Sequence, residues 1–231
     1  MKRAADLFAF DTRPSTSSLL AMTWTTHTEP DPDAEFLSNA VSNWEMVVTR
    51  QWGDGWVTLR GPETKASPAG IPAEAEFLGV VFAHGTFMPQ LDMRRLVDSS
   101  VTFPLVSDEA FWFDGEAWEV PRAHNADVFV ERLVRAGLLV HDPVAAAAVQ
   151  DDDAVDGLST RSVERRVARA TGLTRGTIRQ IARAEQAVEL LGAGVAALEV
   201  VRRLEFADQP HLTRSLKRFV GLTPSQIAPV P

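Results

Sequence analysis

The last third of this 231-residue chain contains a diverged internal repeat with an offset of 49 residues. Residues 162–174 align with residues 211–223: the closing Gly-Leu-Thr is identical, two arginines coincide, and the apolar positions match in kind. Ser159 and Asp208, which can each cap a helix, precede the two copies and are also 49 residues apart. The repeat therefore predicts two copies of one short, capped helix.

Each copy has an apolar side and a cationic side. The residues spaced for burial are Val163, Val167 and Ala170 in the first copy and Leu212, Leu216 and Phe219 in the second. The opposite sides carry Arg161, Arg165 and Arg169 in the first copy and His211, Arg214, Lys217 and Arg218 in the second. Two cationic helices in one chain indicate a periodic, anionic partner, and double-stranded DNA is the candidate.

The net charge of −8 hides a difference between two parts of the chain. Residues 157–231 contain twelve Lys and Arg against six Asp and Glu, a net charge of +6, whereas residues 1–156 have a net charge of −14. Such asymmetry favours a nucleic-acid-binding module beside an acidic partner domain. Charge alone leaves open an ordinary polar domain whose arginines are only solvated.

Several classes of protein are disfavoured by residues that the chain lacks. It has no cysteine, which excludes disulfides, thiolate metal sites and cysteine nucleophiles and fits a cytoplasmic protein. No stretch approaches the roughly 18 apolar residues of a membrane helix, so we expect no membrane contact. The scattered histidines and the lack of a Ser-His-Asp set or phosphate loop predict no metal, no cofactor and no enzyme activity.

Residues 16–120 are predicted to be rich in short β-strands. Runs of β-branched, aromatic and apolar residues alternate there with Gly, Pro and Asp; they are residues 19–26, 44–49, 56–59 and 77–82. Asp114-Gly115 lies between two aromatic runs and predicts a hairpin. Short strands with little helix between them favour a small barrel or sandwich.

Helical spacing begins after Asn125, which can cap a helix reaching about Leu139. A helix follows Pro143, and an acidic loop runs from Asp151 to Gly157. Further helices are predicted over residues 160–170, 175–191, 195–204 and 209–219. The predicted fold class is α+β: a β-rich domain (1–122), a helical linker with the start of the DNA-binding domain (123–157), and an all-α domain (158–231).

The sequence FADQPHLTRSLKRFVGLTP, from Phe206 to Pro224, closely resembles the signature of the AraC/XylS family of bacterial transcription regulators. Upstream, LSTRSVERRV at residues 158–167 and TGLT at residues 171–174 resemble that family's first helix-turn-helix. The resemblance covers about residues 143–228. It implies two helix-turn-helix units that place two recognition helices into successive major grooves, one DNA turn apart.

By matched position, the resemblance also implies which side chains contact DNA. Base contacts would come from Arg161, Ser162, Glu164 and Arg165 in the first helix and from Gln209, His211, Thr213 and Arg214 in the second. Phosphate contacts would come from Arg169, Lys217 and Arg218. Arg166 lies nearer the buried edge and is expected to be structural. The alternative is that these arginines form only a solvated helix face.

The sequence departs from the family pattern at two places, one in each unit. Glu205 occupies a turn position where the family usually has glycine, and a positive φ there would cost about 1 kcal/mol. The turn of the first unit is longer than usual and contains Asp151 to Asp153 and Asp156, which phosphates would repel. We therefore expect the second unit to contribute more to specificity.

The resemblance further implies a cupin-like barrel at the N-terminus, which in relatives binds a small effector or mediates dimerisation. All six tryptophans lie in the first half, and Trp44, Trp52, Trp56 and Trp112 are the candidate effector-binding residues. The alternative is that these tryptophans belong to the core of the barrel. The expected partners are DNA, a small-molecule effector, a second copy of the chain and RNA polymerase. The competing hypothesis is a ligand-independent regulator whose N-terminal domain serves only for dimerisation or protein partners.

Overall fold

The chain folds into a β-rich part followed by a helical part, so the predicted α+β class is confirmed. The computed structural model describes residues 2–3, 9–29, 35–70, 72–150 and 157–229. Its strands are β1 (Lys2–Arg3), β2 (Asp11–Pro14), β3 (Leu20–His27), β4 (Glu35–Ser38), β5 (Glu45–Gln51), β6 (Asp54–Arg60), β7 (Ser67–Gly70), β8 (Ala75–Phe82), β9 (Thr86–Phe87), β10 (Ser100–Ser107), β11 (Ala110–Phe113), β12 (Glu116–Glu119) and β13 (Val140–His141). Its helices are α2 (Met93–Leu96), α3 (Ala126–Arg135), α4 (Pro143–Gln150), α5 (Thr160–Thr171), α6 (Arg175–Gly192), α7 (Ala197–Arg203), α8 (Gln209–Phe219) and α9 (Pro224–Ile227).

A large antiparallel sheet forms the centre of the β-rich part, with strand order β12-β11-β10-β6-β5-β8-β3-β2. The four predicted apolar runs become its central strands β3, β5, β6 and β8. The predicted hairpin at Asp114-Gly115 joins β11 to β12, and both residues have the positive φ that a tight type I′ turn requires, 50° and 84°.

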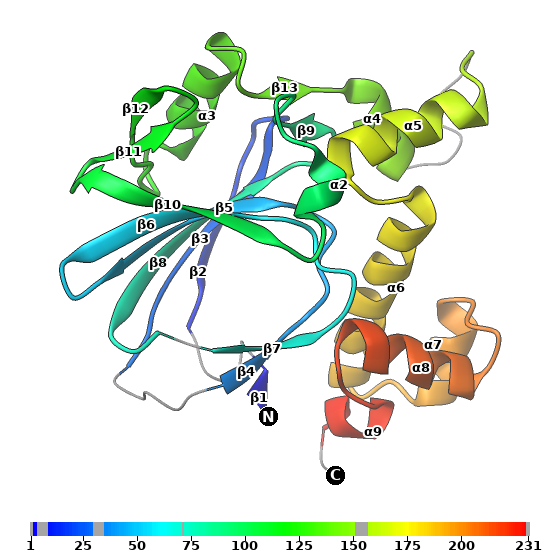
Figure 1. Ribbon diagram of the computed structural model, residues 1–231. Coiled ribbons are helices and arrows are strands. Elements are labelled where there is room, and N and C mark those ends of the chain that lie inside the picture. The colour runs from blue at the N-terminus through cyan, green and yellow to red at the C-terminus, as the bar shows by residue number, and fades with distance from the viewer. Residues whose placement is uncertain (1, 4–8, 30–34, 71, 151–156, 230–231) are drawn as a thin grey trace.

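The two faces of the large sheet are covered by different elements. Because side chains alternate along a strand, Met46 and Val48 of β5 enter the hydrophobic core, whereas Val47 and Thr49 face the other way. Phe129 of α3 belongs to the same core as Met46 and Val48. A small sheet of order β1-β4-β7 lies toward the opposite face, and Figure 1 shows α3 and this small sheet on opposite sides of the large one.

The helix after Asn125 is shorter than the sequence predicts. It ends at Arg135 because Gly137 takes a left-handed conformation, with φ of 73°, and the chain then pairs as β13 with β9. The predicted side-chain cap is wrong, since Asn125 Oδ1 accepts the backbone N–H of Arg122 instead. The domain boundaries stay a prediction. Of the two helices in segment 123–157, α3 packs toward the large sheet and α4 packs against α5.

The helical part is organised around α6, which runs between α5 at one end and α7, α8 and α9 at the other (Figure 1). The predicted helices at 160–170, 175–191 and 209–219 correspond to α5, α6 and α8. Buried side chains of the β-rich and helical parts form one continuous cluster. No helix of the described residues is long and apolar enough to cross a membrane.

The backbones of the helical part and the β-rich part come close together near the ends of α5 and α8. Beyond α5, Gly172 lies so close to α2 that a Cβ on it would be 2.4 Å from the carbonyl oxygen of Met93. At the last residues of α8, the carbonyls of Phe219 and Arg218 accept the backbone N–H groups of Ala40 and Ala66, at 2.7 and 2.8 Å. Because Ala40 follows β4 and Ala66 precedes β7, the small sheet holds the end of α8.

Candidate nucleic-acid interface and ligand cavity

The first repeated helix, α5, forms as its sequence predicts. The Ser159 hydroxyl accepts the backbone N–H of Ser162 at 3.3 Å, which confirms the predicted cap. Val163, Val167 and Ala170 are buried, and the helix ends at Gly172, whose φ is 75°.

The second repeated helix, α8, has the same construction. The Asp208 carboxylate accepts the backbone N–H of His211 at 2.6 Å, so this cap is also confirmed. Leu212, Leu216 and Phe219 are buried against the helical core. The 49-residue repeat is therefore a structural repeat of two capped helices with one buried face each.

The turn before α8 is held by an aromatic anchor. Phe206 is buried, the guanidinium of Arg183 lies 4.6 Å from the centre of its ring, and the His211 ring meets it edge-on at 5.4 Å. Glu205 has φ of 54°, so the position where the family usually has glycine does require the left-handed region. A non-glycine residue there costs on the order of 1 kcal/mol.

Four predicted DNA-contacting cations are exposed on the two helices and form neither an ion pair nor a cation–π contact within the described part of the chain. They are Arg161, Arg165, Arg214 and Lys217. Each can therefore reach a partner without first breaking an ion pair or a ring contact. Gln209, the first residue of α8, is exposed beside them.

Other predicted DNA-contacting residues already have partners. The Glu164 carboxylate accepts from Arg175 Nε at 2.8 Å. The Arg169 guanidinium lies 5.3 Å from the centre of the Phe87 ring in β9, and that of Arg218 lies 4.8 Å from the centre of the Phe219 ring. Their DNA roles stay predictions, and each would require a rearrangement or a shared contact.

The polar residues of the two helices are partly engaged in local hydrogen bonds. Ser162 Oγ accepts from Ser159 Oγ at 3.0 Å, and Thr213 Oγ1 donates to the carbonyl of Gln209 at 3.0 Å. The Nδ1 atom of His211 accepts the backbone N–H of Ala207 at 3.3 Å. These three side chains are half-buried, so the exposed arginines are the better-placed candidates for base contacts.

Arg166 has the structural role that was expected of it. Its guanidinium forms an ion pair with Asp142 at 3.0 Å, and the same carboxylate caps α4 by accepting the N–H groups of Val144 and Ala145. The pair joins the two helices of the first predicted unit. The acidic loop between them, residues 151–156, lies outside the described residues, so its predicted effect on DNA stays a prediction.

The four tryptophans predicted to bind an effector do not lie together. Trp44 is in the core, where its ring stacks on Phe82 at 3.8 Å and its N–H donates to the Thr86 carbonyl. Trp52 is exposed in the β5–β6 turn, and Trp112 is exposed on β11. The remaining candidate, Trp56 of β6, lines a cavity.

This cavity lies between the large and small sheets and has a volume of about 310 Å³. Aromatic rings from both sheets line it, namely Trp24, Phe36, Trp56 and Phe77, together with Phe10, which precedes β2. Trp24 was missed as a candidate. The sequence does contain one signal for it, because a glycine inside a predicted strand, here Gly79, often marks a place where another group comes close. A Cβ on Gly79 would lie 2.0 Å from the Trp24 ring, so a bare glycine in the neighbouring strand makes room for the indole.

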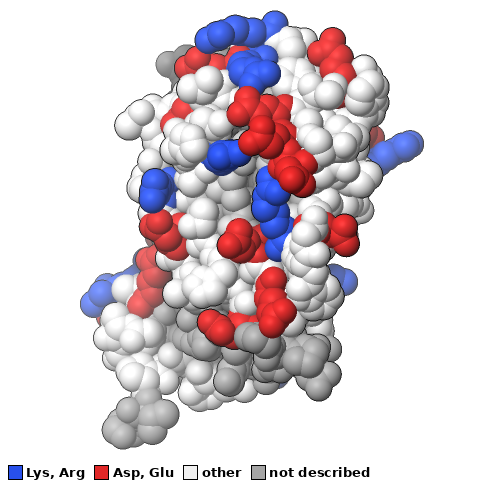
Figure 2. All heavy atoms as spheres, turned by 90° about the vertical axis from the view of Figure 1, so that its left-hand side faces the viewer, with Lys and Arg blue, Asp and Glu red and all other residues white. Residues whose placement is uncertain are grey.

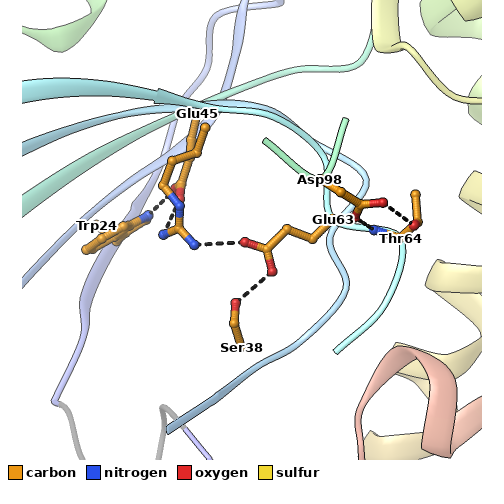
Figure 3. Close-up of polar contacts among 7 residues, drawn as sticks. Trp24, Ser38, Glu45, Glu63, Thr64 and Asp98 are labelled. Carbon is orange, nitrogen blue, oxygen red and sulfur yellow. Dashed lines mark hydrogen bonds and ion pairs between the residues drawn. The ribbon is translucent and has the colours of Figure 1, made fainter. Parts of the chain in front are cut away.

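A polar cluster adjoins the cavity, and Figure 3 shows its contacts. Arg60 donates from its two terminal nitrogens to Glu45 at 3.2 Å and to Glu63 at 2.9 Å. The Trp24 indole N–H donates to Glu45 at 2.9 Å, and Ser38 donates to Glu63 at 2.8 Å. Burial raises the pKa of Glu45, an effect that Arg60 and the Trp24 N–H partly offset.

We expect the free energy of unfolding of Glu45→Gln to increase relative to that of the wild type as the pH rises above about 4.5. Because the folded-state pKa of Glu45 lies above its unfolded value, ionisation costs more in the folded protein, and stability is lost as the pH passes through the raised pKa. Urea unfolding across the pH range measures the difference, with exposed Glu76→Gln as the control. A difference that is constant, or that favours the wild type at higher pH, contradicts this.

A second, wider cavity of about 920 Å³ opens at the strand ends. Charged residues line it, including Arg50, Glu76, Asp108, Glu109 and Arg122. Figure 2 views the molecule from the left of Figure 1 and shows acidic and basic side chains next to one another over that face. Among the described residues, no group of three or more His, Asp or Glu side chains is placed to hold a metal ion.

Comparisons with known proteins add one assignment. Residues 155–228 match the family model of a helix-turn-helix domain, a segment that includes both α5 and α8. A crystal structure of ToxT from Vibrio cholerae O395 is similar at 9% identity, with 94% of this chain and 96% of that chain covered and a TM-score of 0.41. A second ToxT structure from Vibrio cholerae has 10% identity, coverage of 94% and 97%, and a TM-score of 0.41. No curated protein sequence matches.

Proposed function

We propose that the chain is a sequence-specific DNA-binding transcription regulator of the AraC/XylS type, from the premise that residues 155–228 match the family model of a helix-turn-helix domain. One observation carries the proposal: α5 and α8 repeat the same capped helix, with one face buried and exposed cations on the other. Such helices present side chains to base edges in the major groove and to phosphates beside it.

The connection between the two helices fits recognition on one face of DNA. The 18 residues of α6 span about 27 Å at 1.5 Å per residue. Successive major grooves on one DNA face are about 34 Å apart. We propose that Arg161 and Arg165 contact bases in one groove, and Gln209 and Arg214 in the next, while Lys217 contacts phosphates.

Selection from a random DNA library tests this proposal. We expect the full-length chain to enrich a defined sequence at moderate salt, because base contacts survive conditions that weaken phosphate contacts. Enrichment of no sequence above the input library contradicts the proposed function. Paired half-sites in the enriched sequence would support the proposed homodimer.

We also propose that a small molecule bound between the two sheets controls DNA binding. The small sheet supports this, because Phe36, Ser38 and Ala69 form part of the cavity wall. Next to this sheet, Ala40 and Ala66 hold the last carbonyls of α8. A ligand that displaces the small sheet would therefore act directly on the second recognition helix.

The alternative is a ligand-independent regulator whose β-rich part serves only for dimerisation or protein partners. Exposed apolar side chains on β10 and β11 favour this alternative, namely Val101, Val106 and Trp112. A thermal-shift screen separates the two, since failure of diverse small molecules to stabilise the chain favours this alternative. In both versions we propose a cytoplasmic protein that acts by binding, without enzyme activity, and that can recruit RNA polymerase.

A further inference from the structure

The cavity between the two sheets combines aromatic walls with polar groups that are mostly paired. From this we propose that it binds an uncharged, planar aromatic compound. The proposal rests on the proposed function, in which this compound is the effector. It goes further by naming the chemical class that the cavity selects.

The shape of the cavity favours a flat ring system. Trp24 lies on β3 and Phe77 on the neighbouring strand β8 of the large sheet, Trp56 lies on β6, and Phe36 comes from the small sheet. Aromatic rings on both walls suit a planar ligand that stacks or meets them edge-on. A volume of about 310 Å³ lies at the lower end of the range of small-molecule pockets, roughly 300–1,000 Å³, which suits two fused rings with a short substituent.

The charges around the cavity disfavour an ionised ligand. Arg60 is the charged side chain among the described lining residues, and its two terminal nitrogens already donate to Glu45 and Glu63. An ionised ligand would lose its hydration and find no unpaired opposite charge there. A neutral ligand avoids this penalty.

The lining hydroxyls are also largely paired. Thr58 Oγ1 bonds to Thr102 Oγ1 at 3.0 Å, Thr26 Oγ1 donates to the carbonyl of Ala9 at 2.9 Å, and Ser38 donates to Glu63. The cavity therefore offers few groups for a highly hydroxylated ligand such as a sugar. Apolar contact and ring stacking are the main sources of affinity that remain.

The wider cavity at the strand ends does not share these properties. Its lining contains both acidic and basic side chains, and Arg122 and Glu109 pair there at 2.7 Å with more than half of each side chain exposed. Water and salt reach such a surface, so it discriminates weakly between ligands.

Three indole compounds of nearly equal size provide the test. They are indole-3-ethanol, which is neutral, tryptamine, which is cationic, and indole-3-acetate, which is anionic. Isothermal titration of the full-length chain at pH 7 measures each affinity. We expect the neutral compound to bind at least about tenfold more tightly than either ion, because only the ions lose hydration without compensation.

Three outcomes overturn the proposal. Tryptamine binding as tightly as indole-3-ethanol, or more tightly, would indicate a cation site over the tryptophan rings. The same result for indole-3-acetate would indicate that the ligand displaces a glutamate from Arg60. Absence of binding by all three compounds would show that the cavity does not take a fused aromatic ring.

Variants locate the bound compound. Val47→Phe places an extra ring in the cavity and should abolish measurable binding of indole-3-ethanol, whereas Val106→Phe, the same change at an exposed site, should leave it unaltered. If Val47→Phe does not fold, Trp56→Leu serves as the cavity variant. Trp56 is only half-buried, so the fold should tolerate its replacement. Unchanged affinity in the cavity variant contradicts this location.

The ligand proposal and the proposed function can fail separately. Selection of a DNA sequence without binding of indole-3-ethanol would leave the regulator intact and overturn the ligand class. Binding of the neutral compound without any DNA selection would overturn the proposed function instead.

Discussion

Replacing Arg214 with alanine is expected to weaken binding to the selected DNA site by about 1–3 kcal/mol, roughly fivefold to 150-fold, and to relax its sequence preference. Arg214 is exposed on α8, and it forms no ion pair with the described residues. An arginine in this position can donate two hydrogen bonds to guanine, which a wrong base cannot accept. Fluorescence anisotropy with the selected and a scrambled site measures both affinities.

Lys217→Ala is the matched control, because it removes a cation from the same helix at a position expected to face phosphates. It should weaken binding to both sites to a similar degree and reduce the dependence of log K on log salt by about 1. If Arg214→Ala also weakens both sites equally, Arg214 contacts phosphates and does not read sequence.

Gly172→Ala is expected to lower the free energy of unfolding by about 2–4 kcal/mol. One part is backbone strain, since Gly172 has φ of 75°. The larger part is overlap, because the new Cβ would lie 2.4 Å from the Met93 carbonyl oxygen and 2.7 Å from Val97 Cγ2. Relief requires the end of α5 to move away from α2. Urea unfolding of the full-length chain measures the loss.

Gly194→Ala separates strain from overlap. Gly194 has φ of 82°, similar to Gly172, but the nearest heavy atom to its added Cβ is 3.9 Å away. It should therefore lose only about 1 kcal/mol. Equal losses in the two variants would contradict the close contact between α5 and the β-rich part.

Features with local causes could be predicted from the sequence. The caps Ser159 and Asp208 and the helical spacing of apolar residues were sufficient to place α5 and α8 almost to the residue. The hairpin at Asp114-Gly115 was predicted for the same reason, because its turn depends on two adjacent residues. Glu205 showed that a family comparison can also identify a left-handed position.

Features that depend on distant residues could not be predicted. Trp44 and Trp56 look alike in sequence, yet strand alternation and register direct Trp44 into the core and Trp56 into the cavity. The pairing of β4 with β7, which creates the cavity wall, joins segments about thirty residues apart without a local turn signal. Glu164 meets Arg175 only because α5 and α6 pack together.

Protection of guanine N7 from methylation on the selected DNA site tests the central claim most directly, since N7 lies in the major groove. Two recognition helices on one helical domain should protect guanines in two successive major grooves on one DNA face, about 10 base pairs apart. Protection in a single groove, or none at all, would contradict recognition by both α5 and α8.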